Sequence, residues 1–165
     1  MNTLKAEKRS MDVKAKRLRR EGYVTGNVFG KKIQGSIPVK MEKKDVDRLL
    51  KTETKGGQIM LDVEGEVYDV LIKEVDYDAM ANQVVEIDFQ ALVSNEKVHS
   101  VAEIIFENHD KVEAGVLQEV LKEVSYRALP AALVEKVKLM LVRWRLVIRF
   151  VSKTFRSQKI KTLIF

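Results

Sequence analysis

The stretch QIMLDVEGEVYDVLIKEVDYD, residues 58–78, decides the fold class. Apolar and polar residues alternate on both sides of the Glu64–Gly65 pair, and a period of two is typical of a half-buried β-strand. A glycine-containing pair between two such runs is a hairpin signal. The stretch therefore predicts two strands joined by a tight turn.

Strand patterns continue on both sides of this hairpin. Gly26 and Gly30 bracket a short apolar piece and predict tight turns, and Pro38 predicts an edge position or the end of a strand. The spacing of Val46 and Leu49 predicts a helix over residues 41–52. Further strands are expected at residues 3–9, 33–40, 84–93 and 97–108, and short or mixed β elements at 113–130 and 132–137. The sequence predicts a β-rich α+β protein that begins with a small barrel.

The composition restricts the class of protein. The chain has 165 residues, 45% of them hydrophobic and 33% charged, which is typical of a soluble protein with a real core. It has no cysteine, which excludes disulfides and thiolate chemistry and fits the reducing cytoplasm. Residues 1–10 lack the apolar segment of a signal peptide, and no long apolar run predicts a membrane span.

Charge is distributed unevenly along the chain. Residues 1–40 carry 11 bases and 3 acids, and residues 139–165 carry 7 bases and no acid. Residues 41–138 carry 12 bases and 21 acids. The formal net charge of +6 therefore hides a basic arm, an acidic middle and a basic end.

Residue patterns typical of catalysis are missing from the sequence. His99 and His109 have no second ligand-type residue at metal spacing, and we interpret both as surface or half-buried histidines. Asp76 and Asp78 resemble a carboxylate pair, but a polar turn explains them better. We therefore expect neither an enzyme, nor a metal site, nor a cofactor.

The basic arm is the strongest functional signal. Binding to nucleic acid needs several cations on one surface to neutralise phosphates, and Tyr23 and Phe29 just beyond the arm could stack on bases. The alternative is a solvated charge run with both aromatic residues in the core. The cations are Arg9, Lys14, Lys16, Arg17, Arg19 and Arg20.

Four segments together resemble the bacterial large-subunit ribosomal protein twenty-five family, which includes the general stress protein Ctc. They are RLRREGYVTGNVFG (17–30), VLIKEVDYD (70–78), VEIDFQAL (85–92) and GVLQEVLKEVSYRALPAALVEKV (115–137). The last resembles the additional domain of the longer, Ctc-type members. The resemblance covers residues 2–138.

This resemblance implies a non-catalytic protein of the large ribosomal subunit, in the cytoplasm, with a six-stranded β-barrel that binds the loop E region of 5S rRNA. The expected domains are the barrel at 1–93, a partial C-terminal β domain at 94–138 and an aberrant basic tail at 139–165. The RNA-binding residues that it implies are Arg9, Lys14, Lys16, Arg17, Arg19, Arg20, Phe29, Lys31 and Asp88.

Some positions depart from the family's pattern. Glu86 stands where the family has a histidine that faces RNA, and a carboxylate near phosphates is unfavourable unless it accepts from a base amino group. The other departures are Thr25 and Ala79, where the family has proline, and Asp76, where it has glutamine.

The last segment, LMLVRWRLVIRFVSKTFRSQKIKTLIF (139–165), has two interpretations. One lost adenine converts codons for VKIDV into codons for VKLML, the sequence at 137–141, and the other frame permits a string that resembles the family's ending. We therefore predict a frameshifted tail. The alternative is a basic amphipathic helix for a membrane surface or a protein partner, with Arg145, Arg149, Lys153 and Arg156 on one face.

Overall fold

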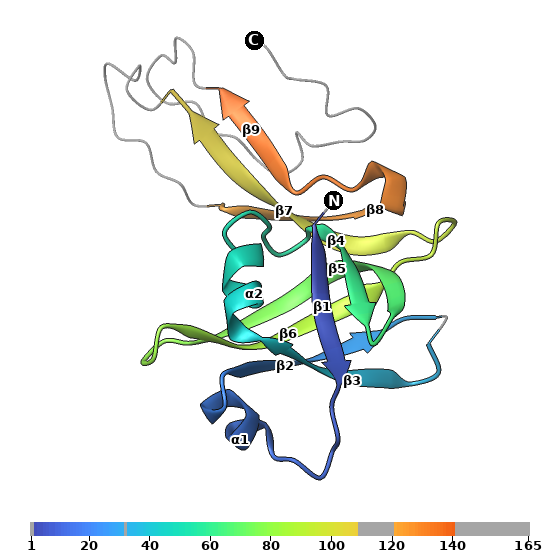
Figure 1. Cartoon of the computed structure of the whole chain (residues 1–165). Helices are drawn as coiled ribbons and strands as arrows, with labels where there is room; N and C mark the ends of the chain where they lie inside the picture. The colour runs from blue at the N-terminus through green and yellow to red at the C-terminus, as the bar shows by residue number, and fades with distance from the viewer. Residues whose placement is uncertain (1, 32, 109–120, 141–165) are drawn as a thin grey trace.

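A computed structural model describes residues 2–31, 33–108 and 121–140 of the chain (Figure 1). Six strands close into a barrel in the order β1-β3-β2-β6-β5-β4. Most neighbours are antiparallel, but β1 is parallel to β4 and β2 is parallel to β6. The strands are β1 (Thr3–Lys8), β2 (Tyr23–Phe29), β3 (Ser36–Glu42), β4 (Gln58–Val63), β5 (Glu66–Asp78) and β6 (Gln83–Ala91). The predicted six-stranded barrel is confirmed.

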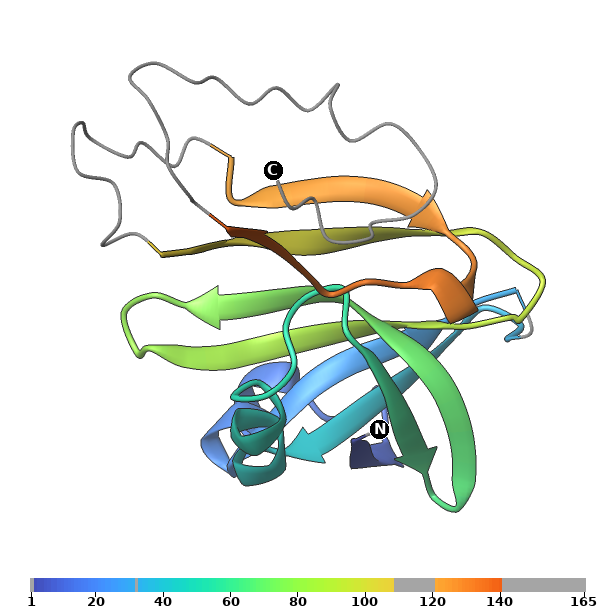
Figure 2. The ribbon, with the colours of Figure 1, turned by 90° about the horizontal axis from the view of Figure 1, so that it is seen from above.

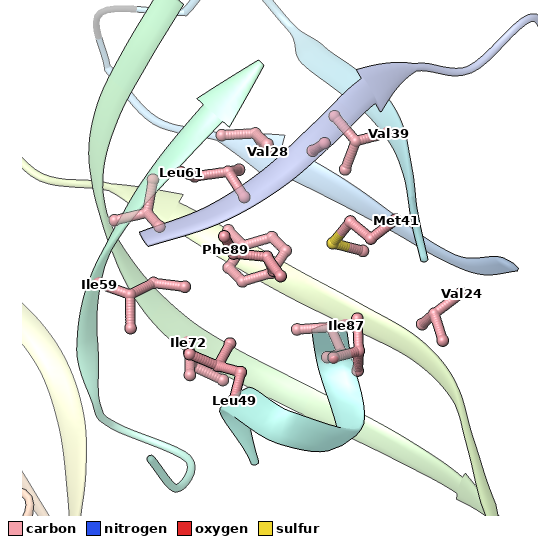
Figure 3. Packing of buried hydrophobic residues seen from close by; sticks show 14 of the residues in the cluster. Val24, Val28, Val39, Met41, Leu49, Ile59, Leu61, Ile72, Ile87 and Phe89 are labelled. Carbon is pink, nitrogen blue, oxygen red and sulfur yellow. The ribbon is translucent and has the colours of Figure 1, made fainter. Parts of the chain in front are cut away.

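The core of the barrel follows from the alternation that the sequence shows. Leu61 on β4, Ile72 on β5 and Phe89 on β6 are fully buried and point into the barrel (Figure 3). Burial of one such side chain contributes about 1.5–3 kcal/mol. The helix α2 (Lys43–Leu49) adds Val46 and Leu49 to the same core. Leu4 and Ala6 on β1 are also buried, as the predicted first strand requires.

The structure corrects two predictions. Gly26 does not mark a turn, because it lies inside β2, where an added Cβ would collide with the carbonyl oxygen of Ile87 on β6. The edge position predicted for Pro38 is wrong, because β3 has neighbours on both sides in the closed barrel, whereas the alternative of a strand end is close to what the structure shows, since β3 begins at Ser36. Pro38 instead lies just beyond the last pair between β1 and β3, Lys8 with Val39. Both errors come from tertiary pairing, which local patterns do not show.

A second, three-stranded sheet lies along one side of the barrel (Figure 2). It has the order β8-β7-β9, with β7 (Val98–Glu107), β8 (Glu123–Ala128) and β9 (Lys136–Met140); the 3-10 helix η2 (Pro130–Ala132) lies between β8 and β9. Val98, Ser100, Ala102 and Ile104 alternate along β7 and are all buried. Leu71 on β5 is fully buried although its neighbours Val70 and Ile72 point into the barrel core. It lines a pocket of about 190 Å³ together with Ser100 and Val101 of β7, so the second sheet covers Leu71 from outside the barrel. The sheet therefore buries apolar surface on the outside of the barrel.

Candidate RNA-binding surface

The basic arm contains a short helix, α1 (Ala15–Arg20), that lies against β2 (Figure 1). Leu18 is 5% exposed and is the buried residue of the helix. Its last turn carries Arg17, Arg19 and Arg20, where cations interact favourably with the helix dipole. One buried leucine thus holds a helix whose other long side chains are exposed cations.

The cations of the arm differ in whether they form ion pairs within the protein. Arg17 forms an ion pair with Glu21, with 2.9 Å between Nε and Oε1. Among the described residues, no ion pair is found for the remaining exposed cations of the arm, Lys14, Lys16, Arg19 and Arg20. These four are the side chains most available to phosphates.

Arg9 differs from the other cations of the arm because it is not exposed and donates hydrogen bonds to the protein backbone. It is half-buried, its backbone N–H donates to the carbonyl oxygen of Pro38 at 2.9 Å, and its Nη2 donates to the carbonyl oxygen of Val13 at 3.1 Å. These contacts hold the loop between β1 and α1. The structure therefore gives Arg9 a positioning contact that the sequence did not indicate.

Phe29 and Lys31 lie at the other end of β2 from α1. Phe29 is half-buried and pairs with Gln90 on β6, and Lys31 is exposed in the turn that follows. The Lys31 ammonium forms an ion pair of 2.6 Å with Glu96, in the segment between β6 and β7. Since a strand rises about 3.3 Å per residue, roughly 20 Å separates the two ends of β2.

Tyr23, at the start of β2, was a candidate for base stacking. The structure places the Lys40 ammonium 4.9 Å from the centre of its ring, which is a cation–π contact. A hydrogen bond from Lys40 to Glu7 raises the pKa of Lys40 above its ordinary value of 10.5, so Lys40 stays charged over the ring. Tyr23 is half-buried, and its ring already contacts Lys40 within the protein.

Carboxylates occupy the outer face of the barrel between the two basic ends. Glu86 and Asp88 on β6 share this face because Ile87 and Phe89 point inward. Across the strand pair, Asp76 lies directly opposite Glu86, and Glu74 directly opposite Asp88. We call these four residues the acidic quartet. Like charges directly opposite on neighbouring strands destabilise a sheet, so the arrangement carries a cost.

Asn27 on β2 reduces that cost, and sequence reasoning missed it. Its side-chain amide donates to Asp88 Oδ1 at 3.3 Å and lies 3.4 Å from Glu86 Oε1. Its backbone N–H also donates to Asp88 Oδ1, at 3.2 Å. The only signal in the sequence was an amide residue inside an apolar strand, and its partners depend on the pairing of β2 with β6.

Thr25, one of the departures from the family's pattern, is 1% exposed. Its hydroxyl donates to the carbonyl oxygen of Val85 at 3.4 Å. Val85 lies where the register between β5 and β6 shifts, between the pairs Asp76–Glu86 and Tyr77–Val84. The threonine therefore satisfies a backbone oxygen at an irregularity of the barrel.

Other kinds of site were also considered. Across residues 2–31, 33–108 and 121–140, no group of three or more His, Asp or Glu side chains could hold a metal ion. Within the same residues, no helix is long and apolar enough to cross a membrane. His99 is exposed on β7, as expected. His109 and the tail beyond Met140 lie outside the described residues, so neither the predicted frameshift nor the alternative basic helix is tested by the structure.

Comparison with known proteins identifies the family. The chain's fold is a closed barrel with a basic arm beside β2 and an acidic quartet on its outer face. The model of the Ribosomal L25p family matches residues 4–89, which contain all six barrel strands except Thr3 of β1 and the end of β6. The chain belongs to the Ribosomal L25p family, which is a family of structural ribosomal proteins and not of enzymes.

Several relatives carry the same description, Large ribosomal subunit protein bL25. The relative from Bacillus pumilus strain SAFR-032 is 33% identical over 135 residues, 79% of this chain and 64% of that protein. The relative from Thermoanaerobacter sp. strain X514 is 28% identical over 118 residues, 70% of this chain and 59% of that protein. The relative from Caldicellulosiruptor saccharolyticus is 32% identical over 116 residues, 69% of this chain and 57% of that protein. The chain thus spans less than two thirds of the length of these relatives.

Proposed function

We propose that this protein binds 5S rRNA, at its loop E region, as a non-catalytic component of the large ribosomal subunit. Its place in the cell is then the ribosome in the cytoplasm, beside other proteins of that subunit. Two findings support the proposal: membership of the Ribosomal L25p family and the row of exposed cations held against β2 by Leu18. A stress-related role, as in Ctc-type members, is part of the same proposal.

The cations of α1 carry the argument. RNA binding draws most of its affinity from phosphate neutralisation, and each neutralised phosphate adds to the salt dependence. Lys14, Lys16, Arg19 and Arg20 are exposed, and none of them has an ion pair within the described part of the chain. A phosphate therefore need not displace a carboxylate to reach them.

Lys31 and Phe29 extend the proposed contact to the far end of β2. Lys31 is exposed, so it can approach a phosphate if it leaves Glu96. Phe29 keeps part of its ring accessible for a ribose or base. The two groups of contacts lie roughly 20 Å apart, at opposite ends of β2. We propose that the RNA runs along β2 from one end to the other.

The acidic quartet limits what the RNA can do between the two ends. Carboxylates repel phosphates, but they accept hydrogen bonds from the amino groups of bases. Asp88 is held by Asn27 and is the acceptor best placed for such a contact. We propose that the backbone of the RNA touches the basic ends and that only base edges face the quartet.

We also propose that residues 1–93 form the RNA-binding domain, and that residues 94–138 form a partial second domain followed by a frameshifted tail. The described sheet of β7, β8 and β9 supports a separate C-terminal unit, since its buried apolar residues lie outside the barrel core. The sheet continues to Met140, slightly beyond the predicted limit. Resequencing the gene is the test of the tail.

A gel-shift titration with 5S rRNA at two salt concentrations tests the RNA proposal. Arg19→Ala and Arg20→Ala should each weaken binding and lower the slope of log affinity against log salt by about 1. Arg48→Ala is the matched control, because Arg48 is an exposed arginine on α2. Unchanged binding and slope in the Arg19→Ala/Arg20→Ala double variant would falsify the assignment of α1.

A further inference from the structure

The barrel and the second sheet together form a small pocket, which we call the junction pocket. It is lined by residues 55–56 of the loop before β4, residues 71–74 of β5 and residues 99–101 of β7, and its volume is about 190 Å³. Pockets that hold drug-sized ligands have about 300–1,000 Å³, so the junction pocket fits only a small group. Since β7 supplies one wall, the pocket depends on the contact between the second sheet and the barrel.

Hydrogen bonds join the walls of the junction pocket across the barrel and the sheet. Ser100 Oγ on β7 donates to the carbonyl oxygen of Gly56 at 3.4 Å, and Lys73 Nζ on β5 donates to the carbonyl oxygen of His99 at 2.8 Å. Gly56 has a φ of +88°, and an added Cβ there would collide with the carbonyl oxygen of Val101. The two walls are therefore held against each other by direct contacts.

Lys73 reaches the pocket because β5 is irregular at this position. It is the extra residue at the register shift between Ile72 and Glu74, where β5 pairs with β6. Such irregularities change the direction of a side chain: Ile72 points into the barrel core, whereas the Lys73 ammonium reaches the carbonyl oxygen of His99 outside it. An ammonium group has three N–H donors, so the bond to His99 leaves two of them for a ligand.

Cations outnumber carboxylates at the junction pocket. Lys55 and Lys73 line it together with the carboxylate-bearing Glu74. Two more exposed cations flank the start of β7: Lys97 directly precedes this strand, and Arg127 lies on the neighbouring strand β8. None of these four cations forms an ion pair within the described part of the chain. The pocket is therefore cationic although residues 41–138 as a whole carry 21 acids and 12 bases.

The junction pocket borders the proposed RNA-binding surface. Glu74, in its lining, lies directly opposite Asp88 in the acidic quartet. Leu71, also in its lining, pairs with Gln90 on β6, and Gln90 pairs with Phe29 on β2. The pocket thus lies level with Phe29 and beside the quartet, with β6 between β2 and β5.

We propose that the junction pocket binds a phosphate group through the ammonium groups of Lys55 and Lys73. Lysine binds phosphate as a point charge, and two ammonium groups outweigh the repulsion from the single carboxylate of Glu74. The phosphate comes either from the backbone of the RNA or from free inorganic phosphate. The RNA source rests on the proposed function, and it makes the second sheet part of the RNA-binding surface.

The test uses the full chain and the double variant Lys55→Gln/Lys73→Gln. Glutamine at position 73 keeps an N–H donor for the carbonyl oxygen of His99 but carries no charge, so the variant separates phosphate binding from the structural role of Lys73. Lys5→Gln is the matched control, because Lys5 is an exposed lysine on β1, a strand that does not pair with β5 or β6.

The first measurement is an NMR titration with inorganic phosphate, at an ionic strength kept constant with chloride. The amide resonances of Gly56, Ser100 and Val101 should shift saturably in the unmodified chain and in the Lys5→Gln control, and these shifts should be lost in the double variant. The second measurement is the affinity for 5S rRNA at several salt concentrations. In the double variant, the slope of log affinity against log salt should fall by about 1, as expected for one phosphate contact.

The two measurements distinguish the sources of the phosphate. A lower slope in the double variant assigns the junction pocket to the RNA backbone, whereas phosphate-dependent shifts with an unchanged slope assign it to free phosphate. Absence of the shifts together with an unchanged slope overturns the proposal. If that slope is unchanged while Arg19→Ala/Arg20→Ala lowers its own, the proposed function stands without the RNA source. A chain that does not bind 5S rRNA refutes the proposed function, and the phosphate titration then decides the pocket. If the double variant does not fold, the phosphate titration of the unmodified chain decides.

Discussion

Asn27 on β2 donates two hydrogen bonds to a single oxygen of Asp88 on β6, from its backbone N–H at 3.2 Å and from its side-chain amide at 3.3 Å. Asp88 Oδ2 has no hydrogen bond within the described part of the chain. Asp88 is thus fixed in orientation with one oxygen left to accept. A fixed acceptor is better prepared for a ligand than a rotating one.

Replacing Asn27 by alanine should reveal this coupling. The side-chain hydrogen bond is lost while the acidic quartet remains, so the free energy of unfolding should fall by about 1–2 kcal/mol. Chemical denaturation of Asn27→Ala, Asp88→Asn and the double variant gives the coupling through a double-mutant cycle. Strictly additive losses would show that the pair is not coupled.

Glu86→Gln should strengthen RNA binding and also stabilise the barrel. The change removes one charge that faces Asp76 and lies beside Asp88, and relief of a like-charge pair across strands is worth about 0.2–1 kcal/mol. Binding is measured by titration with 5S rRNA, with Glu66→Gln as the control outside the quartet. Weaker binding would mean instead that Glu86 accepts a hydrogen bond from a base.

Lys31 should contribute less to RNA binding than Arg19, because Lys31 is paired with Glu96 at 2.6 Å. An exposed ion pair of this kind is worth about 0–1 kcal/mol. Glu96→Gln should therefore raise affinity by up to about fivefold, and this gain should vanish when Lys31→Ala is also present. A gain that persists without Lys31 rules out the pair as its cause.

Gly26→Ala should destabilise the barrel strongly. The added methyl meets the backbone of Ile87, which can move only by separating β2 from β6, and crowding of this kind costs about 1–3 kcal/mol or more. Gly22→Ala is the comparison, since Gly22 has open space around it and only the strain of its φ of +90°. If the denaturation midpoint falls equally in Gly26→Ala and Gly22→Ala, the close approach of Gly26 to Ile87 does not limit the barrel.

Limited proteolysis should leave a stable fragment that ends near residues 92–100. The barrel strands end at Ala91, and the second sheet contacts the barrel through Ser100 at Gly56, through His99 at Lys73 and beside Leu71. Mass spectrometry identifies the fragment, and Phe89→Ala should abolish it, because loss of a buried aromatic side chain costs about 3–5 kcal/mol. Tyr77→Ala, at an exposed aromatic residue, serves as the control. Uniform resistance through residue 165 would contradict the proposed division.

Local pattern was sufficient for most of the barrel. The alternation at 58–78 gave β4 and β5, and the apolar spacing at 41–52 gave α2, because both are determined by which side chains must be buried. The acidic quartet could not be predicted, since it depends on register shifts between β5 and β6 at Ile72–Glu74 and at Asp76–Tyr77. The need for glycine at position 26 likewise could not be predicted, because it arises from the close approach of Ile87 in the folded barrel.

The same limit applies to the candidate RNA-binding residues. Exposure of Lys14, Lys16, Arg19 and Arg20 follows directly from their charge. The ion pair of Lys31 with Glu96 and the loop contacts of Arg9 depend on segments that meet only in the fold. Sequence therefore indicates which side chains are charged, whereas the structure shows which are already engaged.

The two parallel pairs of the barrel have a consequence for its synthesis. Thr3 on β1 pairs with Met60, and Thr25 on β2 pairs with Glu86, so both pairings join segments about sixty positions apart. Closing such long loops is entropically costly and slows folding. As the chain leaves the ribosome from its N-terminus, β1, the basic arm and β2 emerge first, and β2 cannot pair with β6 until β6 has been synthesised. Until Ala91 has emerged, the nascent protein exposes its cations without the barrel that later supports them.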